Sequence, residues 1–312
     1  MAKALTLKEL SKREINLTSG HRLCSGCGAP IVVKMVLLAS DYPLIAANST
    51  GCLEVSSCIS GYTAWKIPWI HNAFENAAAT ISGVETMYRS LKKQGKITQD
   101  IKFIAFGGDG GTYDIGLQSL SGAMERGHDM LYICYDNGAY MNTGIQRSSA
   151  TPFGADTTTR PVGSVVPGKT EKRKNLTKIM AAHNIPYAAQ ASPSHWSDLV
   201  RKVRKALEIT GPKFMNILAP CNRGWRSRTD DAIALSRLGV ETCYWPLYEI
   251  EDGVTRITFK PKEKKPIVDF LKPQGRFKHL FKPEHEGLLA KIQEDIDRDW
   301  EKLQKEEACF AS

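Results

Sequence analysis

Apolar and polar residues along this chain fall into two repeating patterns. Apolar segments of strand length lie at residues 43–50, 101–106, 130–135, 187–190 and 213–218. Apolar residues at helical spacing lie between them, over 29–40, 75–91, 115–126, 177–183 and 195–209. The run at 130–135 is continuous, as expected for a parallel strand covered on both faces. This alternation predicts a doubly wound α/β fold with a mostly parallel sheet.

The pattern changes near residue 240. Residues 242–259 predict a β-hairpin with a turn at Asp252-Gly253, and 284–305 predict a final helix. We therefore divide the chain into a main domain, 1–240, and a C-terminal extension, 241–312, which we expect to contact other subunits. Three segments are expected to be loops, at 51–58, 64–74 and 143–170. The longest, 143–170, is expected to be functional.

Two predicted strands end in residues that suit a metal-bound diphosphate. Asp109 follows the first strand and Asn137 the second, and each offers the kind of oxygen that Mg²⁺ prefers. The carbonyl of Ala139 can supply a third ligand. Three glycines lie beside Asp109, at Gly108, Gly110 and Gly111. They would let backbone amides approach a diphosphate closely. Either turn alone is common, but together, each after a strand, they predict a cofactor site.

Four of the eight cysteines are candidate metal ligands. Cys24 and Cys27 form a C-x-x-C motif, Cys52 follows a predicted strand, and Cys221 follows the last strand of the main domain. Four thiolates can hold zinc or an iron–sulfur cluster, and the residues alone do not choose between them. Cys58 competes with Cys52 for the third position. The remaining cysteines are expected to pack as small apolar residues.

Composition narrows the possible partners. The formal net charge is +9, yet no nucleic-acid-binding motif is present, so an acidic protein or an anionic ligand is the favoured partner. No apolar run reaches the ~20 residues of a membrane helix, and the start lacks a signal core, so we expect a cytoplasmic protein. Lysine-rich stretches at 169–178 and 260–282 are expected to be solvated faces or a docking surface for an acidic partner protein.

The spacing of Gly108-Asp109-Gly110 and Asp136-Asn137 resembles the thiamine diphosphate signature. Longer segments, including TGCLE, WIHNAFENAAA, GGDGGTYDIGLQSLSGAMERGH and QRSSATPFGA, resemble the β subunit of multi-subunit 2-oxoacid:ferredoxin oxidoreductases of the pyruvate type. The resemblance covers residues 20–245. It implies the thiamine diphosphate-binding fold, with thiamine diphosphate and Mg²⁺ as cofactors.

The resemblance also implies roles for individual residues. A 4Fe–4S cluster would be held close to the thiamine by Cys24, Cys27, Cys52 and Cys221, with Cys52 beside both cofactors. Asn142 would be catalytic, through a hydrogen bond to the substrate or its adduct. Electrons from oxidative decarboxylation would pass through the cluster to ferredoxin. The family's activating glutamate lies in the α subunit, so this chain is expected to act only with α and γ/δ-type partners.

The sequence departs from the family at two places. Gly138 replaces an acidic residue, and the segment after Cys221 carries Arg223, Arg226 and Arg228. A loss of negative charge and a gain of positive charge favour a more anionic substrate. We therefore expect pyruvate by family resemblance, with oxalate as an alternative, although the arginines also suit a surface facing solvent or ferredoxin.

Two other classes of protein fit parts of the pattern. A non-catalytic interaction protein with a structural zinc site would use the four cysteines without thiamine. A stand-alone thiamine decarboxylase would need its own activating glutamate and no cluster, and the cysteine set argues against it.

Overall fold

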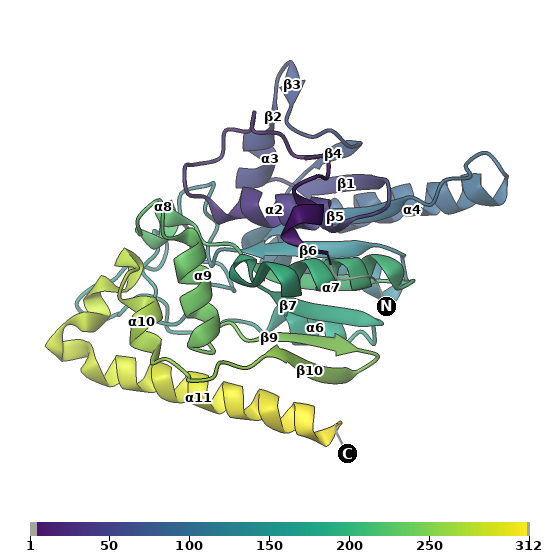
Figure 1. The fold of residues 1–312 in the computed structure, drawn as a ribbon. Coiled ribbons are helices and arrows are strands. Elements are labelled where there is room, and N and C mark those ends of the chain that lie inside the picture. Colours follow the sequence, from purple (N-terminus) through teal and green to yellow (C-terminus); the bar gives the residue numbers. More distant parts are fainter. Residues whose placement is uncertain (1–4, 311–312) are drawn as a thin grey trace.

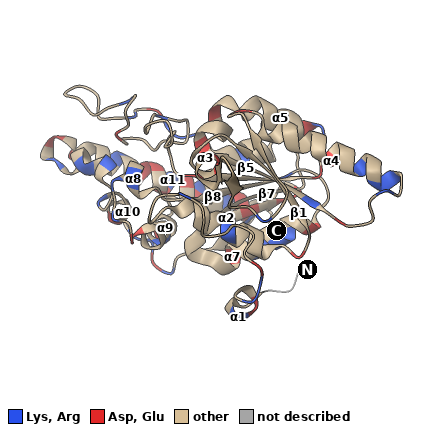
Figure 2. Ribbon diagram, turned by 90° about the horizontal axis from the view of Figure 1, so that it is seen from above, with Lys and Arg blue, Asp and Glu red and all other residues tan. Residues whose placement is uncertain are grey.

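The computed structural model describes residues 5–310 as a central eight-stranded sheet with helices on both faces (Figures 1 and 2). The strand order is β10-β9-β7-β8-β6-β5-β1-β4. All neighbours from β7 to β4 are parallel, whereas β9 and β10 are antiparallel. The strands are β1 (Leu44–Ser49), β4 (Trp69–Asn72), β5 (Lys102–Gly108), β6 (Leu131–Asp136), β7 (Tyr187–Ala191), β8 (Lys213–Leu218), β9 (Leu247–Glu251) and β10 (Val254–Phe259). The predicted doubly wound, mostly parallel fold is confirmed.

Helices cover each face of the sheet because the central strands are apolar on both sides. α2 and α7 pack together on one face, while α4 and α5 cover the other (Figure 2). Helix α6 packs in the same core cluster as α4 and α5. Their bounds are α2 (Gly28–Ala39), α4 (Ala77–Lys93), α5 (Leu117–Glu125), α6 (Leu176–Ala181) and α7 (Trp196–Glu208). Strands β6, β7 and β8 are buried along their whole length, which fixes the carboxyl ends of the parallel strands in a rigid core.

Two segments predicted as loops are regular structure. Residues 52–57 form helix α3 (Cys52–Ser57), and the tryptophan-rich segment contains β4, which pairs in parallel with β1 at the edge of the sheet. Trp65 stacks on Trp69 with ring centroids 5.8 Å apart, so packing favours the strand. Pro68 directly precedes β4, a position that proline tolerates. A small hairpin connects α3 to this region, formed by β2 (Cys58–Ile59) and β3 (Tyr62–Thr63).

The C-terminal part adds two strands and several helices. The β9–β10 turn falls at Asp252-Gly253 as predicted, and β9 pairs with β7, so this hairpin extends the central sheet. The boundary at residue 240 stays a prediction. The remaining elements are α1 (Leu7–Leu10), the 3₁₀ turn η2 (Pro193–His195), α8 (Asn222–Trp225), α9 (Ala232–Glu241), α10 (Ile267–Leu271), the 3₁₀ turns η3 (Gly275–Phe281) and η4 (Pro283–His285), and α11 (Glu286–Cys309).

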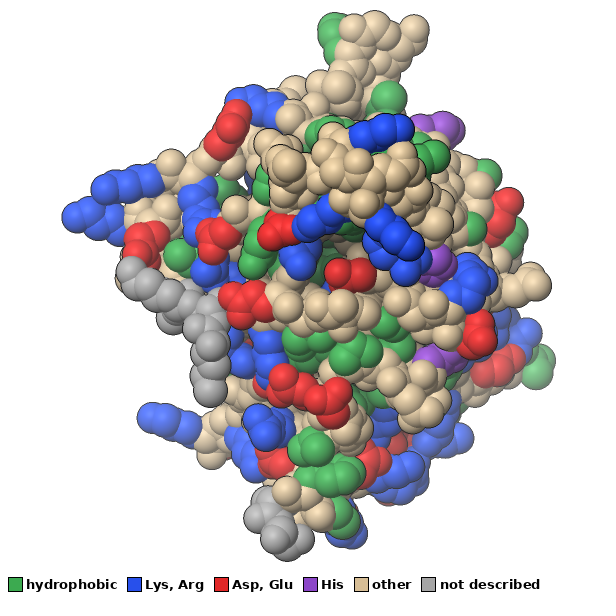
Figure 3. All heavy atoms as spheres, turned by 90° about the vertical axis from the view of Figure 1, so that its right-hand side faces the viewer, with side chains coloured by type: hydrophobic (Ala, Val, Ile, Leu, Met, Phe, Trp, Pro, Cys, Tyr) green, Lys and Arg blue, Asp and Glu red, His purple; other side chains and the backbone are tan. Residues whose placement is uncertain are grey.

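The long helix α11 supplies ion-pair partners for lysines in both lysine-rich stretches. Ion pairs join its acidic residues to both stretches, through Lys172–Asp295, Lys178–Glu306, Lys260–Glu307 and Lys264–Asp297. Lys169 is fully buried, so the expectation of a solvated face is wrong at that residue, whereas Lys172 and Lys260 are exposed beside their ion-pair partners. On the face drawn in Figure 3, basic and acidic side chains are interspersed. Within residues 5–310, no helix is both long and apolar enough to span a membrane.

Candidate cofactor and cluster site

Strands β5 and β6 bring the two predicted ligand turns together. They are adjacent and parallel, with Gly108 beside Tyr135 in the register, so the residues that follow lie side by side. Asp109 is 1% exposed and Asn137 is 8% exposed. The sheet therefore places both side chains at its carboxyl edge, where ligands of such folds bind.

The Asp109 carboxylate is held from two directions. Ser148 Oγ donates to its Oδ2 over 2.5 Å, and the backbone N–H of Asn137 donates to its Oδ1 over 3.3 Å. Burial raises the pKa of the Asp109 carboxyl well above its usual range, and the charge of Asp136 raises it further. A bound divalent cation would reverse this effect by favouring the ionised form.

The side-chain amide of Asn137 contacts both other predicted magnesium ligands. With its nitrogen turned towards them, it donates to Asp109 Oδ1 and to the Ala139 carbonyl, each over 2.9 Å. With the amide turned by half a rotation, its oxygen takes the same position and three oxygens meet. Adjacent oxygen ligands of an octahedral Mg²⁺ site lie about 2.9 Å apart. The three groups therefore fit a magnesium ion.

A π-helical turn, η1 (Gly110–Ile115), separates β5 from α5. Its glycines are required by close neighbours: a Cβ on Gly110 would lie 2.4 Å from the Tyr140 ring, and one on Gly111 would lie 3.0 Å from the Phe74 carbonyl. Their backbone can therefore approach a ligand closely. Such π-turns occur frequently at functional sites.

One cavity is lined by every residue predicted to bind thiamine diphosphate, including Asn142, which is exposed. The β1–α3 turn closes one wall with Thr50, Gly51 and Cys52, and Phe74 and Tyr135 add aromatic surface. The predicted set in this cavity is Gly108, Asp109, Gly110, Gly111, Asn137, Ala139, Asn142 and Cys52. The cavity, with a volume of about 60 Å³, combines converging oxygens, glycine backbone and an apolar wall, which suit a metal-bound diphosphate group. A site for a complete small molecule, about 300 Å³ or more, would extend beyond it.

The candidate cluster cysteines come from three distant segments that meet beside this cavity. Cys27 precedes α2, Cys52 begins α3 and Cys221 precedes α8, so all three lie at helix starts, where backbone N–H groups favour a thiolate. Burial, with smaller contributions from the neighbouring thiols of Cys221, Cys52 and Cys24, raises the pKa of Cys27 to about 12. These four thiols therefore lie close enough to act on one another.

No three His, Cys, Asp or Glu side chains in residues 5–310 converge tightly enough to hold a single metal ion. A 4Fe–4S cluster needs no such convergence, because each iron takes one thiolate and the ligands surround the cluster. The donor set of four free thiols, Cys24, Cys27, Cys52 and Cys221, fits this chemistry. Burial also raises the pKa of Cys52 to about 12, a cost that ligation of iron would offset.

The turn after β6, which carries Asn137 and Ala139 and is called the cofactor turn below, begins at Asp136. The Asp136 carboxylate is the centre of a buried polar network. Its Oδ2 accepts from Tyr113 over 2.6 Å and from Arg173 over 2.7 Å, while its Oδ1 accepts from the N–H of Gly138 over 3.0 Å. Burial raises the pKa of Tyr113, so its hydroxyl stays protonated and can donate. The network therefore fixes the turn that carries Asn137 and Ala139.

The three arginines after Cys221 do not line the cofactor cavity. Arg223 is exposed, Arg226 pairs with Asp156 over 2.8 Å, and Arg228 pairs with Asp230 over 2.7 Å. Arg276 is the buried arginine in this region. It is 2% exposed, its guanidinium lies 4.4 Å from the Trp225 ring centre, and its Nη1 would lie 3.0 Å from a Cβ on Gly138.

Sequence reasoning missed several residues that support the site. Ser148 orients Asp109, and Trp225 Nε1 donates to the Asn137 carbonyl over 2.6 Å. Tyr113 and Arg173 hold Asp136. Tyr113 lies inside the GGDGGTYDIG segment and was the only one of these with a local signal. The others approach from distant parts of the chain.

Comparison with known proteins agrees with this geometry. The family described as thiamine pyrophosphate enzyme, C-terminal TPP binding domain, matches residues 49–217. A chain of 2-oxoglutarate:ferredoxin oxidoreductase from Magnetococcus marinus shares the fold with a TM-score of 0.54 at 21% identity, over 72% of this chain and 78% of that one.

Closer relatives identify the family. The pyruvate synthase subunit PorB of Thermotoga maritima is 56% identical, over 95% of this chain and 93% of that protein. PorB of Methanocaldococcus jannaschii is 54% identical, over 90% and 95%. The ketoisovalerate oxidoreductase subunit VorB of Pyrococcus abyssi is 45% identical, over 94% and 93%. The chain therefore belongs to the β-subunit family of the 2-oxoacid:ferredoxin oxidoreductases, and it is an oxidoreductase subunit of a multi-subunit enzyme.

Proposed function

We propose that this chain binds thiamine diphosphate through a magnesium ion held by Asp109, Asn137 and the carbonyl of Ala139. The contact of the Asn137 amide with both other ligands carries this proposal. The diphosphate would lie against the backbone of Gly110 and Gly111 in the same cavity. The ring system would lie on the side of the cavity that Phe74, Tyr135 and Cys52 form.

The same proposal assigns a 4Fe–4S cluster to Cys24, Cys27, Cys52 and Cys221. It is supported by the mutual effect of their thiols and by the position of Cys52, which lines the thiamine cavity. A ligand shared between the cavity wall and the cluster would place the two redox groups in direct proximity. Cys58 begins the β2–β3 hairpin, one helix away from Cys52, and is assigned no ligand role.

When bound, thiamine diphosphate supplies the carbanion chemistry for oxidative decarboxylation of a 2-oxoacid. Asn142 lines the cavity from an exposed position, where its amide can hydrogen-bond an entering carboxylate or keto oxygen. Ferredoxin is the proposed electron acceptor. The α and γ/δ-type subunits would complete the site, because no acidic side chain other than Asp109 lines the cavity within residues 5–310.

Pyruvate is the proposed substrate. The PorB relatives are subunits of pyruvate synthase, whereas VorB belongs to a ketoisovalerate oxidoreductase, so the family includes different substrates. The oxalate alternative rested on Gly138 and on three arginines after Cys221. The three arginines lie outside the cavity, so that part of the argument for oxalate is lost.

A substrate panel on the assembled complex tests the proposal. Methyl viologen reduction would be measured with pyruvate, 2-oxoglutarate, 2-oxoisovalerate and oxalate, alongside thiamine, magnesium and iron content. We expect the highest kcat/KM for pyruvate and a brown protein bleached by dithionite. A complex free of thiamine would contradict the proposed cofactor, and a preference for oxalate would contradict the substrate.

A further inference from the structure

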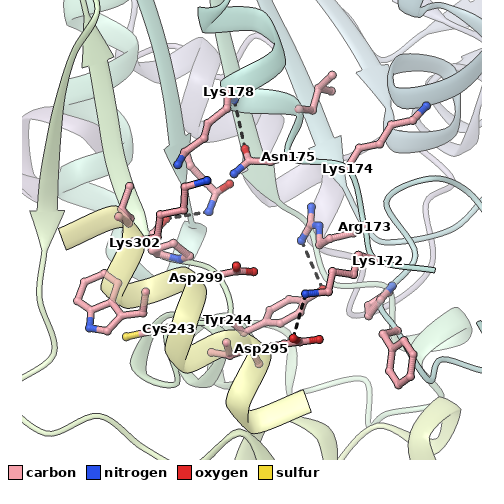
Figure 4. A pocket seen from close by; sticks show the side chains of 18 of the residues that line it. Lys172, Arg173, Lys174, Asn175, Lys178, Cys243, Tyr244, Asp295, Asp299 and Lys302 are labelled. Atoms are coloured by element: carbon pink, nitrogen blue, oxygen red, sulfur yellow. Dashed lines mark hydrogen bonds and ion pairs between the residues drawn. The ribbon is translucent and has the colours of Figure 1, made fainter. Parts of the chain in front are cut away.

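A second cavity lies between α11 and the sheet, and its lining includes Tyr113 and Arg173, which donate to Asp136. It has a volume of about 350 Å³, within the range of about 300–1,000 Å³ typical of small-molecule sites. One wall is the segment 172–178, and the facing wall is α11 (Figure 4). We call this cavity the α11 pocket.

Basic side chains outnumber acidic ones in the lining of the α11 pocket. The acidic lining residues are Asp295 and Asp299, and the basic ones are Lys172, Arg173, Lys174, Lys178 and Lys302. Four of the basic residues have an acidic partner, in the pairs Lys172–Asp295, Arg173–Asp136, Lys174–Asp114 and Lys178–Glu306. Figure 4 shows Asp299 and Lys302 projecting from α11 on the side that faces the basic segment. Within residues 5–310, Lys302 is the one basic lining residue without an ion pair, so it is the cation most available to a negatively charged ligand.

Aromatic and apolar side chains form the rest of the wall, with Tyr244 and Tyr248 on the sheet side and Ile296, Trp300 and Leu303 from α11. The floor contains an unsatisfied acceptor. Asn216 is 1% exposed, its Nδ2 donates to Tyr113 over 2.7 Å, and its Oδ1 has no hydrogen-bond partner. A buried acceptor without a partner is costly, and a ligand donor would remove that cost.

We propose that the α11 pocket binds a small aromatic anion that also carries a hydrogen-bond donor. The acidic group lies between Arg173 and Lys302, the ring packs against Tyr244 and Trp300, and the donor reaches Asn216 Oδ1. The α11 pocket and the cofactor cavity have no lining residue in common, so the α11 pocket is a separate site.

Arg173 connects the α11 pocket to the cofactor turn. Its guanidinium lines the pocket and donates to Asp136 over 2.7 Å, and Asp136 in turn accepts from the N–H of Gly138. A bound anion competes with Asp136 for this guanidinium and so loosens the turn that carries Asn137. Binding at the two sites is therefore antagonistic and reciprocal. This part rests on the proposed function, whereas binding of the anion does not.

A fluorescence titration of the assembled complex with 8-anilinonaphthalene-1-sulfonate tests the site, because this probe combines an aromatic body, a sulfonate and an N–H donor. We expect a saturable component that Ile296→Trp abolishes by filling the pocket. Lys302→Glu should weaken it about five-fold, as expected for reversing a charge near the surface. Ala290→Trp and Lys305→Glu, exposed positions on the same helix, should leave it unchanged.

The same component in Ile296→Trp, or no saturable component in the assembled complex, would overturn the site. The coupling is tested by the thiamine diphosphate Kd with and without saturating probe. We expect it to rise several-fold, by the same factor as the probe Kd rises with saturating cofactor. A thiamine diphosphate Kd that is the same with and without the probe would overturn the coupling. Probe binding by a complex that does not bind thiamine diphosphate would overturn the proposed function alone.

Discussion

The backbone N–H of Gly28 donates to the carbonyl of Pro220 over 2.9 Å, so the residues next to Cys27 and Cys221 are in direct contact. A Cβ on Gly28 would lie 2.7 Å from Pro220 N. The start of α2 can reach the end of β8 only because residue 28 has no side chain. This contact sets the separation of two of the four candidate cluster ligands.

Replacing Gly28 by alanine should therefore separate Cys27 from Cys221. Overpacking of this kind costs about 1–3 kcal/mol and shifts the backbone. We expect the Gly28→Ala complex to lose most of its iron while it keeps thiamine diphosphate, as measured by metal analysis and a thiochrome assay. Gly83→Ala, on helix α4 with open space around it, should keep both cofactors. Full iron occupancy in Gly28→Ala would show that this contact does not set the ligand geometry.

Serine variants of Cys52 and Cys58 separate the two candidates for the third cluster ligand. Cys52 interacts with Cys221 and Cys24, so Cys52→Ser should lower iron content or change the low-temperature EPR signal of the reduced complex. Cys58→Ser should behave like Cys309→Ser, a variant at an exposed position. Loss of the signal in Cys58→Ser with retention in Cys52→Ser would reverse the assignment.

Removal of the Ser148 hydroxyl should weaken cofactor binding without removing a ligand. Its bond to the Asp109 carboxylate is charge-assisted, and such bonds contribute about 1.5–3 kcal/mol. Ser148→Ala should raise the thiamine diphosphate Kd about ten-fold or more, measured by calorimetry in the presence of Mg²⁺. Asp109→Asn should have the larger effect, and Ser90→Ala, at an exposed position, should have none. An unchanged Kd in Ser148→Ala would refute the positioning role.

Lys169 predicts a pH dependence of stability. Its Nζ donates to the Thr151 carbonyl over 2.6 Å, and burial lowers its pKa to about 8 from an ordinary 10.5. Because the unfolded chain binds this proton more tightly, the buried charge is destabilising below about pH 8, and the penalty falls as pH rises towards about 10.5. Between about pH 7 and about pH 9.5, the free energy of unfolding of the wild type should rise by about 2 kcal/mol relative to that of Lys169→Met.

Urea unfolding of the isolated chain at the two pH values measures this difference. Lys305→Met, at an exposed position, should track the wild type at both. A wild type whose stability relative to Lys169→Met is the same at both pH values would show that the ammonium is not desolvated in the folded chain.

The proximity of Asp109 and Asn137 was predictable from sequence because each belongs to a local pattern. Asp109 and Asn137 directly follow apolar strands, and adjacent parallel strands bring their ends together. The strand–helix alternation likewise specified the parallel core of the sheet. Local periodicity and the resemblance pointed to the same place.

The residues that complete the site carry no such signal. Ser148 reaches Asp109 across 39 positions, and Trp225 reaches Asn137 across 88. Arg276 was overlooked because arginine is usually exposed, and its burial is offset by long-range stacking on Trp225 together with a hydrogen bond from its Nε to Gln274. β4 was missed because four residues are too few for a pattern, and its pairing with β1 decides its conformation.

The meeting of Gly28 with Pro220 has a consequence for biogenesis. On the ribosome, Cys24, Cys27 and Cys52 emerge long before Cys221, and their final geometry waits until β8 has inserted between β6 and β7. On the proposed ligand assignment, the growing chain presents three of the four thiols throughout that interval without the fourth. Insertion of iron and sulfide would then follow synthesis of the first two-thirds of the chain.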